Sequence, residues 1–464
     1  MATEELDAFV ASAASEYGIP GAAVGVWHEG RAGYACHGVT SVANPLAITP
    51  DTVFSVGSVS KSFTATAVMR LVADGLIDLD ARVREYVPEL VLGDEQAAAS
   101  ITVRHLLNHT AGLGVRLVVE TGDGDDALAG FVARMNELEQ LAPVGERASY
   151  SQAGYNLLGR VVEKVTGHGF EEAVAEVALR PLGLEHTTYH LNDVMTGRFA
   201  VGHNADADGN PVVAREWKDT RGNNPGGGIA SSAADLLAWA RFHLGASDAA
   251  GAASVLPAAV RESMREQTVE LRGSSLGDGF GICWFLRDLD GVRVIGHGGS
   301  GNGQFADLQF VPGRDFAVVS LTNAGPGGVA FNQALVRWTL EHYLGVVDKD
   351  PEPVAYDAAR AAELVGHYEI DAMTLDIATD GGVLTLEVRI KAELRAGSAK
   401  ELPADYPPFE FGLLAADGDD YIVTTGAFAG QRGFFSRDEH GAIVGCDLAG
   451  RMFTRSQGLC EVQI

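Results

Sequence analysis

Ser58 and Lys61 belong to a Ser-x-x-Lys tetrapeptide that stands where a helix is predicted to begin. Positions i and i+3 of a helix share a face, so the hydroxyl and the amine are expected to point the same way. The helix N-terminus favours the negative charge of an alkoxide or oxyanion. A lysine that is partly desolvated beside other cations has a lowered pKa and can take the hydroxyl proton. The pair predicts a serine nucleophile with a lysine base; in the alternative, Ser58 caps the helix and Lys61 is a surface lysine.

Tyr150-Ser151-Gln152 stands at the predicted start of another helix. A tyrosine that is poised against a lysine can carry a proton to a leaving group. In isolation the segment is more typical of a capping turn with a packed tyrosine. Only its combination with other motifs favours the catalytic interpretation.

A glycine-rich segment over residues 297–300 (His-Gly-Gly-Ser) follows directly on a predicted strand. Glycines let the backbone of a strand approach a ligand closely, so Gly299 is expected to border the substrate. The backbone N–H of Ser300 can pair with that of Ser58 as an oxyanion hole. His297 is expected to face the same cleft; in the alternative, the segment is a strand-end turn with a solvated histidine.

Taken together, Ser-x-x-Lys, Tyr-x-Gln and His-Gly-Gly occur in this order with wide separations. They resemble the three-motif pattern of class C β-lactamases, penicillin-binding DD-peptidases and related esterases. Other segments look like the same superfamily, and these are residues 101–113, 154–159, 225–228 and 296–299. The resemblance covers about residues 15–345 and implies a β-lactamase/transpeptidase-like fold.

The resemblance implies a role for each motif residue. Ser58 is expected to be the acylated nucleophile and Lys61 its base. Tyr150 is expected to relay a proton to the leaving group and to the deacylating water. His297 takes the place that many relatives give to the lysine of Lys-Thr-Gly, and the N–H groups of Ser58 and Ser300 are expected to form the oxyanion hole.

Two residues depart from the family pattern. Gln152 stands where the family usually has asparagine, and its extra methylene changes its reach to the substrate or to Lys61. A partly neutral imidazole at His297 offers less carboxylate binding than lysine, which fits the esterases and peptidases of the family better than β-lactam resistance. Asn108 and His109 lie in a recurrent family segment and are interpreted as structural.

Hydrophobic periodicity and turn residues indicate the elements that must position these motifs. We expect helices over 6–17, 58–74, 102–109, 154–165, 232–244 and 328–344, and strands over 22–27, 34–39, 292–295, 305–311 and 316–321. Strands, then helices, then strands again indicate an α+β fold, in which an antiparallel sheet is flanked by helices and carries an inserted helical subdomain. We expect this hydrolase domain over residues 1–347.

A polar, proline-containing linker is expected over residues 348–354. Short strand candidates follow over 368–370, 375–377, 384–390, 421–425 and 443–448, and they predict an all-β barrel domain over 355–464 that resembles the lipocalin-like domain of some family members. The barrel either packs beside the hydrolase domain or reaches over the Ser58 cleft with one of its loops. For the second case the candidate loops are the aromatic segments 406–409 and 433–435.

Composition limits the partners. The net charge is −28, with 62 acidic against 34 basic residues, so nucleic acids and anionic membranes are not expected to bind. No stretch approaches the roughly 20 apolar residues of a membrane span. The four cysteines, Cys36, Cys283, Cys446 and Cys460, form no CxxC pair, and we expect no metal or cofactor. With an acidic N-terminus that is unlike a signal peptide, a cytoplasmic protein with free thiols is expected, and it can form homo-oligomers.

The predicted function is hydrolysis of an ester or of a small peptide amide, D-configured peptides included. A second interpretation keeps the acyl-enzyme but replaces water by an amine or alcohol, as in a transacylase or a peptide-cyclising enzyme of secondary metabolism. A third is a non-catalytic binding module, against which the intact Ser58, Lys61 and Tyr150 argue.

Overall fold

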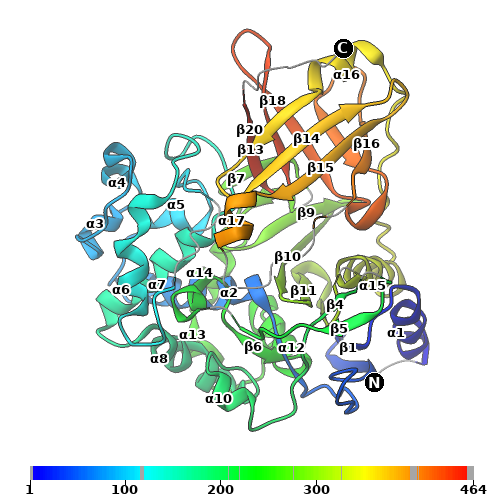
Figure 1. Cartoon of the computed structure of the whole chain (residues 1–464). Coiled ribbons are helices and arrows are strands. Elements are labelled where there is room, and N and C mark those ends of the chain that lie inside the picture. Colours follow the sequence, from blue (N-terminus) through cyan, green and yellow to red (C-terminus); the bar gives the residue numbers. More distant parts are fainter. Residues whose placement is uncertain are drawn as a thin grey trace.

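The computed structural model describes residues 4–456, apart from 115–119, 207, 219, 275, 326, 398–404 and 406. It consists of an eight-stranded sheet, helices that pack on it, and a separate closed β-barrel in the C-terminal part of the chain (Figure 1). The predicted α+β fold with a C-terminal all-β barrel is therefore confirmed.

The large sheet is antiparallel, with strand order β2-β1-β12-β11-β10-β9-β8-β7. Its strands are β1 Gly21–His28, β2 Arg31–Gly38, β7 Val269–Ser274, β8 Gly277–Phe280, β9 Phe285–Leu289, β10 Val292–Gly301, β11 Gln304–Val311 and β12 Phe316–Thr322. The hairpin of β1 and β2 was predicted, as were β10 to β12, whereas β7 to β9 were not. Because β1 pairs with β12, with Ala22 opposite Thr322, the helical region between them is inserted into the sheet.

Alternate residues of the central strands pack on opposite faces of this sheet. In β12, Val318 belongs to a hydrophobic cluster with α1 (Glu4–Glu16) and α15 (Gly327–Leu344), whereas Val319 belongs to the larger core on the other face. The helix α12 (Ala233–Leu244) packs on that second face. The sheet is thus covered on both sides and holds the strand that carries His297 in a fixed place.

Local capping signals set several helix ends of the inserted region. Thr102 caps α5 (Val103–Leu107), and Ser232 caps α12; in both cases the hydroxyl accepts a backbone N–H three residues later. Ser151 caps α7 (Gln152–Thr166) in the same way. Other α-helices of the inserted region are α3 Val83–Tyr86, α4 Glu95–Ser100, α6 Ala127–Ala133, α8 Phe170–Val174, α9 Arg180–Leu182, α10 Leu191–Val194, α11 Asn224–Gly227, α13 Ala252–Val255 and α14 Ala258–Ser263.

Several predicted helix boundaries were wrong; α7, for example, begins at Gln152 rather than at residue 154. The helix that was expected from residue 58 begins with a 3₁₀ turn at Gly57–Val59, and the α-helix α2 covers Ser60–Ala73. The helix α5 ends at Leu107 rather than at His109, because the His109 backbone has a positive φ of 60°, which a helix does not allow.

The C-terminal barrel is closed by pairing of its first and last strands. Its strands are β13 Gly366–Glu369, β14 Met373–Thr379, β15 Leu384–Ile390, β16 Phe409–Leu413, β17 Asp420–Val423, β18 Arg432–Arg437, β19 Ile443–Leu448 and β20 Arg451–Arg455, and α16 (Ala358–Leu364) precedes them. Five of the eight strands were predicted, and β16, β18 and β20 were not. The domain division at 347 and 355 stays a prediction, because a fold does not show that either part folds by itself.

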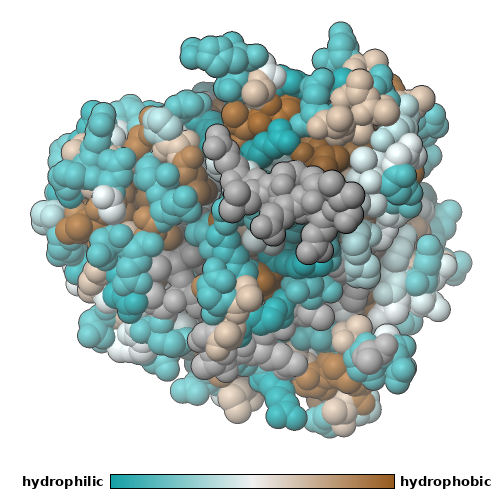
Figure 2. Space-filling view, turned by 45° about the horizontal axis from the view of Figure 1, so that its top comes forward, coloured by the Kyte–Doolittle hydropathy of each residue, from teal (hydrophilic) through white to brown (hydrophobic). Residues whose placement is uncertain are grey.

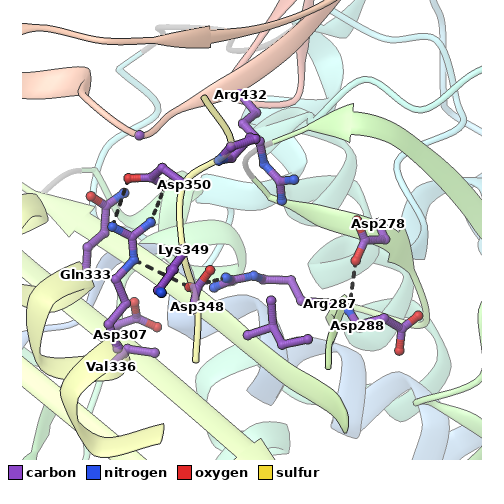
Figure 3. A pocket seen from close by; sticks show the side chains of 14 residues that line it. Asp278, Arg287, Asp288, Asp307, Gln333, Val336, Asp348, Lys349, Asp350 and Arg432 are labelled. Carbon is purple, nitrogen blue, oxygen red and sulfur yellow. Dashed lines mark hydrogen bonds and ion pairs between the residues drawn. The ribbon is translucent and has the colours of Figure 1, made fainter. Parts of the chain in front are cut away.

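Ion pairs fasten the segment between the two parts to the sheet. Asp348 lies 2.5 Å from the Arg287 guanidinium and 3.5 Å from that of Arg337, which also pairs with Asp350 (Figure 3). These side chains line a cavity of about 140 Å³ that Arg432 of the barrel borders. Residues 348–350 are therefore held against the sheet and α15 by ion pairs.

Three of the four cysteines, Cys36, Cys283 and Cys446, are free thiols, and Cys460 lies outside the described residues. No helix in the described ranges has the length and apolar character needed to cross a bilayer. On the face that Figure 2 shows, hydrophilic side chains surround separate hydrophobic patches among the described residues.

Candidate active site

Ser58 lies in the 3₁₀ turn that connects the short strand β3 (Val53–Ser55) to α2. Its hydroxyl does not cap the helix, so that alternative is wrong. The neighbouring Ser60 stabilises the turn instead, because its hydroxyl donates to Gly57 O at 2.6 Å and accepts the Ile229 N–H at 2.9 Å. The Ser58 hydroxyl is thereby left for chemistry.

Lys61 is fully buried, so its interpretation as a surface lysine is also wrong. Its Nζ lies 3.1 Å from Ser58 Oγ and 2.7 Å from Gly226 O, and it donates to Gln152 Oε1. Gly226 belongs to α11 and to the Pro-Gly-Gly-Gly motif, so the backbone of this motif contacts the proposed base directly. A buried lysine that touches a serine hydroxyl and two carbonyl oxygens is placed to exchange a proton with that hydroxyl.

Tyr150 lies beside this pair, with its ring centroid 4.9 Å from Lys61 Nζ. Burial raises the pKa of the Tyr150 phenol well above its usual range, and the nearby Ser58 hydroxyl and Arg451 guanidinium oppose this shift only in part. The phenol is therefore protonated at neutral pH. No described residue meets its oxygen with hydrogen-bond geometry, which leaves it able to donate to a substrate.

His109 supports Tyr150 from behind, in line with its interpretation as structural. The two ring centroids are 4.4 Å apart, and His109 Nδ1 accepts the Ser151 N–H at 3.2 Å. Asn108 ends α5 and accepts the Thr110 hydroxyl at 2.7 Å. The recurrent 101–113 segment thus positions the tyrosine motif.

His297 and Ser300 lie within β10 and not in a turn after it, so the predicted strand end was wrong. Pairing with β11, in which His297 is opposite Leu308, extends the strand through the glycines. A Cβ on Gly299 would lie 2.0 Å from Val56 O and 2.9 Å from Ser58 N, so only glycine allows the strand to approach the Ser58 turn this closely. The approach brings the backbones of Ser58 and Ser300 together.

His297 is buried and not solvated. Burial, and next the charge of Lys61, lower the pKa of its imidazole to about 3, so the ring is neutral at physiological pH. Nδ1 lies 2.6 Å from Gly298 O; because a carbonyl only accepts, Nδ1 carries the proton. Nε2 is then an acceptor, and it has no hydrogen-bond partner among the described residues.

Gln152 faces Lys61 and belongs to a set of amides that the sequence did not reveal. Its Nε2 donates to Asn223 Oδ1 at 2.7 Å, and Asn156 Nδ2 donates to the same oxygen at 3.1 Å. Asn156 lies inside the recurrent segment 154–159, so a signal for it existed. Asn223 had none, because it precedes the glycine motif by two residues and looks like an ordinary loop residue.

The barrel also reaches this site, through the turn between β19 and β20. The Tyr150 N–H donates to Gly450 O at 3.0 Å, and the Arg451 guanidinium carbon lies 5.7 Å from the Tyr150 ring centroid. Neither candidate aromatic segment provides this contact among its described residues. Tyr406 lies outside the described residues, and in the other segment Phe434 packs near Arg272 while Phe435 is in the barrel core.

Comparisons with known proteins identify the family and the fold. The Beta-lactamase family profile matches residues 6–340. Penicillin-binding protein 4 of Amycolatopsis lactamdurans is 36% identical over 364 residues, which are 76% of this chain and 94% of the relative. A crystal structure of SurE with D-Leu is similar over 98% of this chain and 99% of that one, with a TM-score of 0.74 and 26% identity. A class C beta lactamase from Rhodobacter sphaeroides shares the fold over 72% of this chain and 98% of its own, with a TM-score of 0.59 and 24% identity.

Proposed function

Because this chain belongs to the beta-lactamase family of serine hydrolases, we propose that it forms an acyl-enzyme on Ser58 and hydrolyses esters or small peptide amides. One observation carries the proposal: the fully buried Lys61 amine lies 3.1 Å from the Ser58 hydroxyl, while carbonyl oxygens of Gln152 and Gly226 accept hydrogen bonds from the same amine. This arrangement suits a neutral amine whose lone pair accepts the hydroxyl proton.

In the proposed acylation, Lys61 takes the Ser58 proton as Oγ attacks the substrate carbonyl carbon. The carbonyl electrons move to oxygen, and the N–H groups of Ser58 and Ser300 bind the resulting oxyanion. When the intermediate collapses, Tyr150 donates its phenol proton to the leaving group and regains one from Lys61. A water then attacks the acyl-enzyme and loses its proton through Tyr150 to Lys61. When this second intermediate collapses, Lys61 returns the proton to Ser58 Oγ and the acid product leaves.

The substrate is proposed to be an ester or a short peptide, D-configured residues included. The D-leucine that accompanies SurE in its crystal structure, and the name of the penicillin-binding relative, support a D-amino acid or D-peptide. The neutral His297 supports substrates for which a cation at this position is not needed. Gln152 and Gly299 border the space in front of Ser58 and are proposed to contact the acyl group.

A second candidate function is transfer of the acyl group to an amine instead of water. The observation that favours it is the Arg451 charge beside Tyr150, because an amino-acid acceptor carries a carboxylate that a guanidinium can bind. The similarity over 98% of this chain to SurE, which was crystallised with D-Leu, also supports an amino-acid acceptor.

The experiment is intact-mass analysis after incubation with activated esters, D-peptide esters, penicillin and a fluorophosphonate. We expect a single acyl adduct that peptide mapping places on Ser58 and that Ser58→Ala abolishes. Ser60 and Ser62 are built-in controls, because their buried hydroxyls are already hydrogen-bonded to Gly57 O and Val59 O. An adduct on either control, or none on the wild-type protein, overturns the proposal. Addition of D-leucine then separates the two candidates, since a transferase gives the amide product and a hydrolase only the acid.

A further inference from the structure

We propose that Asn223 and Asn156 are positioning residues that fix which end of the Gln152 amide faces Lys61, and thereby aim the lone pair of Lys61 at Ser58. The inference rests on the proposed function, because it concerns the base of that reaction. It concerns one of the two positions that depart from the family pattern, the glutamine at 152.

Gly226, Asn156, Asn223 and Gln152 form a chain of hydrogen bonds that leads to Lys61, here called the relay. It begins at the backbone N–H of Gly226. Gly226 N donates to Asn156 Oδ1 at 3.2 Å, and Asn156 Nδ2 donates to Asn223 Oδ1 at 3.1 Å. Gln152 Nε2 donates to the same Asn223 oxygen at 2.7 Å, and Gln152 Oε1 accepts from Lys61. Asn156 is 1% exposed, whereas Asn223 and Gln152 are half-buried at the edge of the site.

The direction of each hydrogen bond in this relay follows from the first one. A backbone N–H can only donate, so the Asn156 atom that meets Gly226 must be oxygen, and the other end of that amide must be nitrogen. The Asn223 atom that faces this nitrogen must then accept, and it is oxygen. Because Gln152 meets that same oxygen, it presents its nitrogen there and its oxygen to Lys61.

The consequence for Lys61 is a defined orientation of its amine. Gln152 Oε1 and Gly226 O can only accept, so two of the Nζ hydrogens point at them. In the neutral amine the remaining tetrahedral position is the lone pair, and it faces Ser58 Oγ at 3.1 Å. Gly226 thus contributes at both ends, because its N–H donates to Asn156 and its C=O accepts from Lys61. The backbone of this one residue therefore orients both the amides and the amine.

The longer side chain at 152 is fitted to this arrangement. A Cβ on Gly226 would lie 2.0 Å from Gln152 Nε2, so the glutamine amide occupies the space that a side chain at 226 would take. The glutamine spans from Asn223 to Lys61 across this glycine. An asparagine at 152 is one methylene shorter, and we expect it to reach one of the two partners but not both.

The test compares two variants that add the same charge but differ in hydrogen bonding. Asn223→Asp keeps the accepting oxygen that both neighbours need, whereas Asn156→Asp replaces the donor that Asn223 Oδ1 requires. After Asn156→Asp, Asn223 must turn its amide, which then forces Gln152 to present its N–H groups to Lys61. The exposed Asn44→Asp is the matched control for charge alone.

The measurement is the rate of Ser58 labelling by a fluorophosphonate from pH 5 to pH 10. Asn223→Asp is expected to move the acidic limb upward by about one pH unit, because a nearby carboxylate favours the ammonium form of Lys61, and to recover a rate within about threefold of wild type at high pH. Asn156→Asp is expected to stay about 100-fold slower across the whole range. Among the described residues, the other titratable groups that face Lys61 include Tyr150, Tyr155, His109, His297 and Cys283, and no variant changes them.

Equal high-pH rates for the two variants overturn the relay. If Asn156→Asp does not fold, as shown by loss of its thermal transition, Asn223→Ala takes its place. Labelling of Asn223→Ala is expected to be at least about tenfold slower than wild type at every pH, whereas Asn223→Asp recovers its rate at high pH. A wild-type labelling rate for Asn223→Ala also overturns the relay. Absence of labelling in the wild-type protein refutes the proposed function itself and is distinct from these outcomes.

Discussion

Tyr150→Phe should separate the role of the phenol in proton donation from its role in packing. The Tyr150 hydroxyl is buried and has no hydrogen-bond partner among the described residues, so the substitution breaks no such bond. We expect the free energy of unfolding to stay the same or to rise by up to about 1 kcal/mol, because a buried unsatisfied hydroxyl is removed. We expect kcat/KM to fall by about 10² to 10⁴-fold for esters with poor leaving groups, which is the usual contribution of a general acid.

The assay is kcat/KM, which reports acylation, for a series of esters with one acyl group and leaving groups from alkoxide to nitrophenolate. A nitrophenolate leaves without a proton, so for that ester Tyr150→Phe should lose less than about tenfold. The matched control is Tyr155→Phe, because the Tyr155 hydroxyl donates to Leu107 O at 2.9 Å and is buried. This control should lose about 1–3 kcal/mol of stability and keep the wild-type dependence on the leaving group. An equal loss by Tyr150→Phe on all esters would refute proton donation by the phenol.

Three other predictions follow from buried groups. Lys61→Arg should be within about tenfold of Lys61→Ala in Ser58 labelling, because a guanidinium cannot give up its proton; retention of most activity would make the lysine only an electrostatic aid. His297→Ala should lower kcat/KM by about 10- to 100-fold without changing its pH profile around pH 6.5, since burial has already moved the pKa of His297 to about 3; a lost limb near 6.5 would contradict this. Burial raises the pKa of Asp447 from 3.8 to about 7, so its folded state favours the protonated form. The free energy of unfolding should therefore fall, by up to about 1.4 kcal/mol per unit, as pH rises from about 4 to 7, and urea titrations of Asp447→Asn should show a flatter curve there.

The parts of the site that were predictable from the sequence depend on local contacts. Ser58 and Lys61 are one helical turn apart, so their spacing alone was enough to bring them together. The caps at Thr102 and Ser232 are likewise set by residues three positions away. In the barrel, β15 was found because Leu384–Ile390 alternates apolar and polar residues.

The parts that were missed depend on contacts between distant segments. The predicted strand stopped at residue 295, before His297, and only pairing with β11 extends β10 through the glycines that follow. The Gly-rich strand β8 has no alternating pattern and forms by pairing with its neighbours. By contrast, β7 begins Val-Glu-Leu-Arg and β16 reads Phe-Glu-Phe-Gly-Leu, and their alternation was a usable signal.

The position of Tyr150 shows why the barrel belongs in any account of this site. The His109 ring packs against the Tyr150 ring in a tilted arrangement, and the backbone C=O of Gly450 accepts the Tyr150 N–H. A Cβ on Gly450 would lie 2.1 Å from the Leu276 side chain, so the barrel turn also seats against the large sheet where β7 meets β8. Removal of the barrel would therefore take away a hydrogen bond of the proposed proton donor and the Arg451 charge beside it. A change in substrate preference after removal of the barrel could thus come from a displaced Tyr150 as well as from loss of a surface that selects acyl groups. Single substitutions in the 448–451 turn separate these two causes, because they perturb the contact with Tyr150 while the barrel stays in place.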